Sequence, residues 1–199
     1  MNRRLWLLVL VPVLLAGLLG YMHFAAAPPG NLDGASIGGA FSLIDQTGRK
    51  VTDKDFAGQY RLIYFGYTFC PDVCPTDVAM MTKGLNAFAA SNASDAAKVQ
   101  PIFITIDPVR DTPAALAPFV AAFHPRLIGL TGTPAQIAAV SRTFGVYGKR
   151  MPGGDDQNYL MDHSAMLYLF GPDGAPIAFL PHQGLDAAQV RDMLATYVR

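Results

Sequence analysis

The chain has 199 residues, 51% of them hydrophobic, and its 15 lysines and arginines balance its 15 aspartates and glutamates. The zero net charge and the lack of a lysine-arginine cluster argue against a nucleic-acid-binding surface. With only two cysteines, the chain is also not a small fold held together by several disulfides. The two thiols are therefore expected to have a chemical role.

Residues 1–27 are predicted to be an N-terminal membrane anchor or signal. Arg3 and Arg4 precede an uncharged apolar run that is long enough to cross the ~30 Å hydrocarbon core of a bilayer. A small-x-small cleavage pattern ends this run, but Pro28 stands directly after it and argues against processing. We expect an uncleaved single-pass transmembrane helix with its basic end in the cytoplasm. Residues 28–40, rich in Pro, Gly and Ala, are expected to be a tether.

The remaining residues, 41–199, suit one domain with a full-sized core. Short apolar runs predict buried strands at residues 62–67, 101–107, 127–130 and 165–170. Apolar spacing and capping patterns predict helices that begin near residues 75, 112, 133 and 186. Turn residues predict two hairpins, one within residues 41–52 and one around residues 171–174. This order predicts an α/β domain with a central mixed sheet and helices on both faces.

The two cysteines, Cys70 and Cys74, lie in the segment TFCPDVCP, residues 68–75, between a predicted strand and a predicted helix. A dithiol at this junction matches a thioredoxin-like arrangement. Cys74 is expected just before the helix, where the helix dipole lowers the pKa of a thiol. The pair suits either disulfide exchange or capture of a soft metal ion. A purely structural disulfide is disfavoured because so short a loop constrains little of the unfolded chain.

A metal site needs a third ligand, and the four histidines differ in their prospects. His23 falls in the membrane segment, and His124 is expected at the end of a helix. His182 follows a proline in a polar turn and is expected to be solvent-exposed. His163 stands just before a predicted strand, in the loop that faces the dithiol in thioredoxin-like folds. Asp162 beside it is a possible hydrogen-bond partner that would orient the imidazole.

Two thiolates and one imidazole suit a soft or borderline ion. Copper(I) accepts a three-coordinate site of this kind, copper(II) adds a weak fourth ligand, and zinc accepts the same set with one open position. Charge and spacing do not separate these metals. Metal capture and disulfide exchange also use the same two sulfurs, so both remain open from the residues alone.

The motifs together resemble the SCO/SenC family of copper chaperones. The resemblance runs over most of the exported domain and is carried by five ordered segments: GGAF (38–41), FGYTFCPDVCP (65–75), TIDPVRDTP (105–113), IGLTG (128–132) and DHS (162–164). It implies a thioredoxin-like domain anchored to a bacterial inner or mitochondrial inner membrane. It also implies that copper, as Cu(I) and Cu(II), is bound at Cys70, Cys74 and His163.

The family role implied by this resemblance is maturation of the dinuclear copper centre in subunit II of cytochrome c oxidase. The expected protein is a metallochaperone of the bacterial inner membrane with its C-terminal domain in the periplasm. Its implied partners are subunit II and, as further candidates, other periplasmic copper chaperones or thiol reductants. The alternative is a thiol–disulfide oxidoreductase that reduces acceptor cysteines through Cys70 and Cys74 before metallation. A redox or copper sensor is a third reading, but no segment indicates a signalling partner.

Other matched residues have more ordinary expected roles. Asp107, Arg110 and Asp111 are expected to form a turn with an ion pair at the end of a strand. Gly66 is expected to allow close backbone approach beside the thiols. Asp72, between the cysteines, is expected to be exposed.

Overall fold

The computed structural model describes residues 30–199, and the predicted membrane anchor lies outside them. The main sheet contains eight strands, in the spatial order β1 (Gly30–Asn31), β10 (Pro176–Pro181), β9 (Met166–Phe170), β4 (Tyr60–Gly66), β5 (Val99–Thr105), β6 (Ile128–Thr131), β2 (Ser42–Asp45) and β3 (Lys50–Thr52). β4, β5 and β6 are parallel, whereas β9, β10 and β2 run antiparallel to their neighbours. The sheet is therefore mixed, as predicted.

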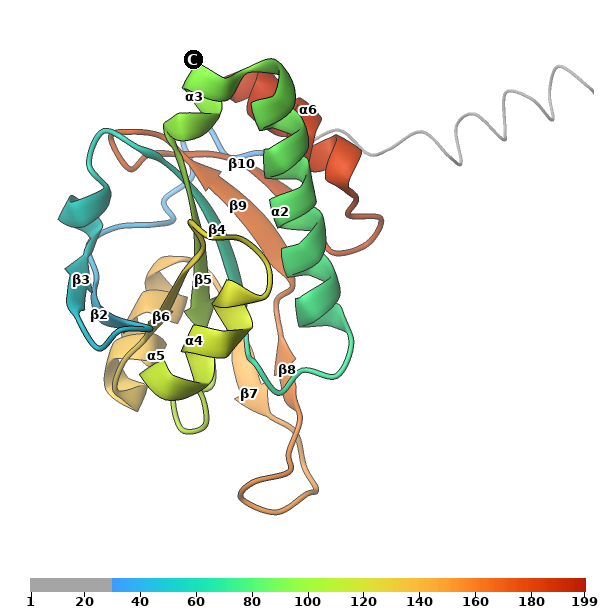
Figure 1. The fold of residues 1–199 in the computed structure, drawn as a ribbon. Coiled ribbons are helices and arrows are strands. Elements are labelled where there is room, and N and C mark those ends of the chain that lie inside the picture. Colours follow the sequence, from blue (N-terminus) through green and yellow to red (C-terminus); the bar gives the residue numbers. More distant parts are fainter. Residues whose placement is uncertain (1–29) are drawn as a thin grey trace, which may run out of the picture.

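The helical segments are η1 (Asp53–Phe56), α2 (Val73–Ser91), α3 (Ala93–Ala97), α4 (Pro113–Ala121), α5 (Pro134–Thr143) and α6 (Ala187–Tyr197). Figure 1 shows α2 and α6 side by side against the sheet. The two helices approach closely at Gly84 of α2, where an added Cβ would lie 2.4 Å from the Cβ of Val190. No helix within residues 30–199 has the length and apolar character needed to span a membrane.

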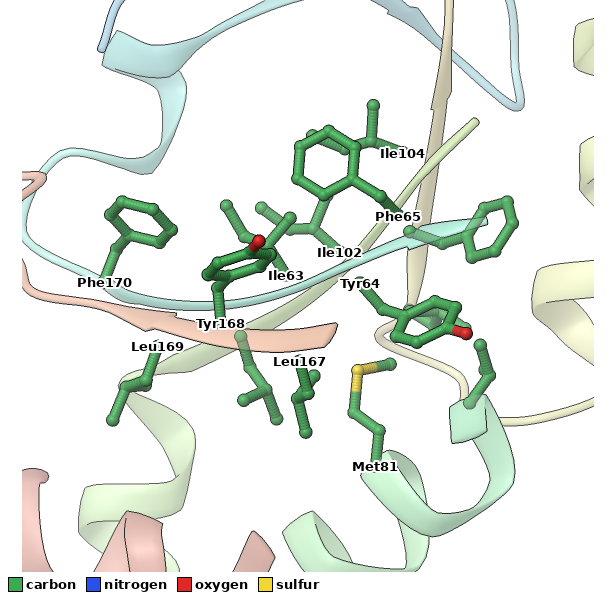
Figure 2. Packing of buried hydrophobic residues seen from close by; sticks show 14 of the residues in the cluster. Ile63, Tyr64, Phe65, Met81, Ile102, Ile104, Leu167, Tyr168, Leu169 and Phe170 are labelled. Carbon is green, nitrogen blue, oxygen red and sulfur yellow. The ribbon is translucent and has the colours of Figure 1, made fainter. Parts of the chain in front are cut away.

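Alternating side chains of the central strands build one core layer on each face of the sheet. On one face the ring of Tyr64 stacks on Phe103, which packs against Phe119 of α4. On the other face Phe65 packs against Phe144 at the end of α5. Figure 2 shows Phe65 and Tyr64 on opposite sides of β4. The predicted placement of helices on both faces is thus confirmed.

The burial of β4 on both faces explains why this strand can be recognised from its sequence. All seven of its residues are buried, because it lies between β9 and β5 and is covered on both faces. Each fully buried large apolar side chain contributes about 1.5–3 kcal/mol relative to its exposed state. The strand ends at Gly66, and the cysteine loop follows at once.

A separate two-stranded hairpin, β7 (Gly148–Arg150) and β8 (Met161–His163), extends from the domain below the sheet in Figure 1. Its register pairs Gly148 with His163 and Arg150 with Met161. The hairpin was not predicted, because its first strand is exposed and polar and lacks an alternating apolar pattern. It carries His163 back to the N-terminal end of α2.

Candidate metal site at the start of α2

The cysteine loop runs from the end of β4 into the first turn of α2. The sequence predicted Cys74 just before the helix. In the structure it is the second residue of α2, and it is fully buried. Cys70 is partly exposed, and its sulfur accepts a hydrogen bond of 3.4 Å from the backbone N–H of Cys74. Both cysteines are free thiols in this structure.

His163 lies against the buried thiol although 89 positions separate the two residues. Its Nε2 is 3.4 Å from Sγ of Cys74, and its Nδ1 is 3.1 Å from the carbonyl oxygen of Ser164. A carbonyl can only accept a hydrogen bond, so Nδ1 carries the proton and the Nε2 lone pair faces the sulfur. This is the tautomer that an imidazole ligand needs. Asp162 was predicted to orient the imidazole, but neither hydrogen-bonding contact of the His163 ring involves it.

The distance between Cys74 and His163 is close to that of two donors on one ion. An ion bonds to sulfur at about 2.3 Å and to nitrogen at about 2.0–2.1 Å. At a sulfur–ion–nitrogen angle of about 105–120°, the sulfur and the nitrogen therefore lie roughly 3.5–3.8 Å apart. The separation of 3.4 Å between the sulfur of Cys74 and Nε2 of His163 falls just below this range. Within residues 30–199, no three His, Cys, Asp or Glu side chains have the full spacing of a formed metal site.

The pKa of Cys74 is raised, whereas the sequence predicted that the helix dipole would lower it. A hydrogen bond from the thiol of Cys74 is the main cause that lowers the pKa of Cys70, against burial, which raises it. The same bond and burial raise the pKa of Cys74. The more exposed sulfur is therefore the first to become a thiolate. Helix-dipole reasoning failed for Cys74 because burial and hydrogen bonding to its neighbour outweigh the dipole.

The wall beside the thiols is closely packed. A Cβ added to Gly66 would lie 3.0 Å from the sulfur of Cys74 and 2.9 Å from the ring of Tyr64, so the predicted close approach is confirmed. The ring of Tyr67 lies edge-on to the imidazole of His163, with 5.9 Å between the ring centroids. The Tyr67 ring and the Ser164 carbonyl together restrict rotation of the imidazole. Asp72 is exposed, as predicted.

Asp107 and Arg110 form the ion pair expected from the sequence, with Nε of Arg110 donating to Asp107 over 2.6 Å. The pair also holds the segment that precedes β8. The Tyr159 hydroxyl donates to Asp107 over 2.7 Å, and Arg110 donates to the backbone carbonyl of Tyr159 over 2.9 Å. The guanidinium lies 3.5 Å above the Tyr159 ring and 4.7 Å from the ring of Phe69, next to Cys70. Arg110 thus joins the cysteine loop to the chain that delivers His163.

Replacing Arg110 by alanine is expected to destabilise the domain by about 3–5 kcal/mol, because it leaves the carboxylate of Asp107 buried without its ionic partner. Arg191→Ala, on α6, is the matched control, since its ion pair with Asp192 is 46% and 63% exposed and should contribute at most about 1 kcal/mol. Urea unfolding of both variants measures the difference. Equal losses would show that the buried pair does not anchor this segment.

The structure also shows a polar contact that sequence reasoning missed. His182, expected to be exposed, is half-buried, and its Nδ1 lies 2.8 Å from Oδ1 of the buried Asp77 on α2. The two residues are 105 positions apart. Neither belongs to a recognisable motif, so no local sequence signal could have paired them.

Comparison with known proteins places this geometry in a family. The profile of the SCO1/SenC family matches residues 29–199. The human protein "SCO1 homolog, mitochondrial" is 41% identical over 165 residues, which cover 82% of this chain and 53% of the human protein. The chain spans about half the length of the curated relatives it matches first, including 52% of the Bos taurus "SCO2 homolog, mitochondrial", which is 48% identical over 141 residues.

A solved structure of a protein similar in sequence shows the same fold. Bradyrhizobium japonicum ScoI, a structure with copper bound, superposes with a TM-score of 0.72 at 43% identity, over 81% of this chain and 99% of that one. The α/β architecture with its central mixed sheet is therefore the thioredoxin-like fold of Sco proteins. On its family profile and its similarity to these relatives, this chain belongs to the SCO1/SenC family.

Proposed function

We propose that the protein is a copper chaperone that binds copper through Cys70, Cys74 and His163. The observation that carries the proposal is the 3.4 Å approach of His163 Nε2 to the sulfur of Cys74 across 89 positions of sequence. Two soft thiolates hold Cu(I), and the imidazole adds a donor suited to Cu(II). The copper-bound ScoI structure, 43% identical to this chain, supports copper over zinc as the cargo.

The geometry supports delivery by ligand exchange. Cys70 is partly exposed and Cys74 is buried, so an acceptor thiolate can reach the ion from the side of Cys70 while Cys74 and His163 still hold it. Binding requires loss of the thiol protons, and the lowered pKa of Cys70 makes its proton the easier one to remove. We propose the dinuclear copper centre of cytochrome c oxidase subunit II as the acceptor. The proposed location is the periplasmic face of a bacterial inner membrane, with residues 1–27 as the anchor.

Titration of the reduced full-length chain tests the proposal. We expect one tightly bound equivalent of Cu(I) and, with Cu(II), a thiolate-to-copper charge-transfer band that saturates at one equivalent. The chain with an oxidised Cys70–Cys74 disulfide is the control and should show neither, because its sulfurs are no longer thiolates. Absence of both signals from the reduced protein would refute the assignment.

A second candidate function is reduction of an acceptor disulfide, supported by the low pKa of the partly exposed Cys70. Its thiolate would attack one acceptor sulfur, forming a mixed disulfide and releasing the other acceptor sulfur as a thiolate. Cys74 would then attack Cys70, which frees the second acceptor thiol and closes a Cys70–Cys74 disulfide. The acceptor gains two electrons and the chaperone loses two.

A reductase assay on an oxidised acceptor peptide, with copper rigorously removed by a chelator, separates the two functions. Release of both acceptor thiols in step with loss of the chaperone thiols would establish reduction. An acceptor that stays oxidised would leave copper delivery as the role of the pair.

A further inference from the structure

The β7–β8 hairpin presents an apolar face to solvent. Within residues 30–199, five large hydrophobic side chains are exposed, and three of them belong to this hairpin. They are Tyr147, Met151 and Leu160, which are 51%, 44% and 48% exposed. Figure 1 shows the hairpin standing out from the domain at the end where α2 begins. We call these three side chains the hairpin face.

The strand register places the three side chains on one side of the hairpin. The backbone N–H of Met151 donates to the carbonyl of Leu160 over 2.8 Å, so these two residues lie opposite each other. Neighbouring side chains of a strand point to opposite faces, and Met161, next to Leu160, packs against the core. Leu160 and Met151 therefore face away from the core. Tyr147 lies four positions before Met151 along the same extended segment, and its carbonyl accepts from the N–H of Ser164 over 3.0 Å, so it shares this face.

The hairpin face adjoins the candidate metal site. A pocket of about 550 Å³ is lined by Cys70 and His163 and also by Met151 and Leu160. Cys70 is the partly exposed thiol, from whose side an acceptor can reach the ion. A molecule that covers the hairpin face therefore lies at the edge of this pocket, next to the sulfur that it must approach.

The charges around the hairpin face favour a protein over a membrane surface as its partner. The segment 147–164 contains two basic and three acidic residues, and Lys149 lies opposite Asp162 in the strand register. A segment that binds a membrane surface combines apolar side chains with an excess of Lys and Arg, which attract anionic lipids. The hairpin has no such excess. Exposed apolar residues bordered by polar ones are typical of a protein interaction surface.

We propose that the hairpin face docks the protein that accepts copper, through an apolar and uncharged surface beside the acceptor's own thiolates. This inference rests on the proposed function and names the residues that hold the acceptor during transfer. In the docked complex the acceptor thiolates replace those of Cys70 and Cys74 on the ion. Copper remains Cu(I) throughout, and the protons that the acceptor thiols release are taken up by the thiolates of Cys70 and Cys74.

Kinetics of Cu(I) transfer test the docking role, with the full-length chain in lipid nanodiscs as donor and the apo copper domain of subunit II as acceptor. Met151→Ser combined with Leu160→Ser should raise the acceptor concentration that gives the half-maximal rate by about ten-fold or more, because central apolar contacts carry much of the binding energy of an interface. The maximal rate and the affinity for Cu(I) should be unchanged, since neither residue is a proposed ligand.

The swap Met151→Leu with Leu160→Met is the matched control, because it keeps both positions apolar and should transfer copper as the unaltered chain does. Both side chains are about half exposed, so thermal unfolding of all these variants should match that of the unaltered chain. A swap variant that behaves like the serine variant would mean that the thioether of Met151, and not the apolar face, matters for transfer, and would overturn the proposal.

A photo-cross-linker at the same position identifies what covers the hairpin face. On irradiation with loaded chain and acceptor, Leu160→benzoylphenylalanine should form an adduct with the subunit II domain. Lys54→benzoylphenylalanine, at an exposed position of η1, is the control and should form none. An adduct of the Leu160 variant only with a second copy of this chain, or only with the nanodisc lipids, would overturn the proposal.

The kinetics also separate failure of the docking face from failure of the proposed function. An unaltered chain that binds Cu(I) but delivers none to subunit II would sink the proposed acceptor and the docking face together. Delivery by the serine variant with an unchanged half-maximal concentration would leave the proposed function standing and remove the docking face.

Discussion

Replacing His163 by alanine is expected to weaken Cu(II) binding by on the order of 100-fold or more, while Cu(I) binding falls by less than about ten-fold. Loss of a residue that only orients a metal ligand costs about 10–100-fold in affinity, so loss of the ligand itself should cost at least the upper end of that range. Cu(I) is satisfied by two soft thiolates, whereas Cu(II) prefers a set that includes nitrogen. The charge-transfer band of Cu(II) should also shift or fade.

Paired competition titrations of the two oxidation states measure this split. His124→Gln is the control, because it removes an imidazole that does not line the pocket and whose Nδ1 accepts a backbone N–H from Arg126. A His163→Ala variant that retains both oxidation states as well as the unaltered chain would remove this residue from the site. Loss of both states to the same extent would point to collapse of the pocket rather than to a missing ligand.

Much of the scaffold follows from local sequence patterns. The strand predicted at residues 62–67 is β4, which spans Tyr60–Gly66, and its unbroken apolar character reflects burial on both faces. The caps of α4, α5 and α6 are Thr112, Thr133 and Asp186, and each side chain accepts the backbone N–H bond that its motif predicts. Such signals are readable because each involves residues within one turn of one another.

The contacts around the pocket beside the cysteines, in contrast, join residues that are far apart in the sequence. His182 and Asp77 meet only because α2 lies beside the end of β10, and nothing within a few residues of either one encodes that meeting. His124 lies beyond the end of α4 at Ala121, not in its last turn, because the helix stops before the proline at residue 125. The arrival of His163 beside Cys74 was predicted from its place before a strand of a thioredoxin-like fold and from the family resemblance, since the hairpin that delivers it begins with an exposed strand of little local pattern.

Replacing Asp111 by alanine is expected to destabilise the domain by about 3–5 kcal/mol and to loosen the cysteine loop. Asp111 is fully buried and accepts hydrogen bonds from the backbone N–H of Thr68 and from the hydroxyls of Thr68 and Thr105. Removing the carboxylate leaves one buried donor, on Thr105, and two partly buried donors, on Thr68, without an acceptor. A fully buried donor without an acceptor costs about 1–3 kcal/mol before relaxation. Because Thr68 is two residues before Cys70, we also expect weaker copper binding at temperatures where the variant is still folded.

The loss of folding stability caused by Asp111→Ala should depend on pH in a defined direction. Burial raises the pKa of Asp111 above its usual value, so the folded state holds the proton more tightly than the unfolded chain does. The stability contributed by this shift is fully present below the unfolded pKa of about 3.9 and is lost as pH rises through the folded value. The gap between the unaltered chain and Asp111→Ala should therefore be widest in acid and narrower at pH 8.

Urea unfolding at several pH values measures that gap, with the exposed Asp72→Ala as the control, whose effect should stay within about 0.5 kcal/mol at every pH. A gap that widens as pH rises would mean that the ionised carboxylate is the form favoured by folding, and that the three hydrogen bonds outweigh burial. A gap below about 1 kcal/mol throughout would mean that the loop is held mainly by Arg110 and the hairpin. In that case Arg110→Ala alone should reproduce the loss of copper binding.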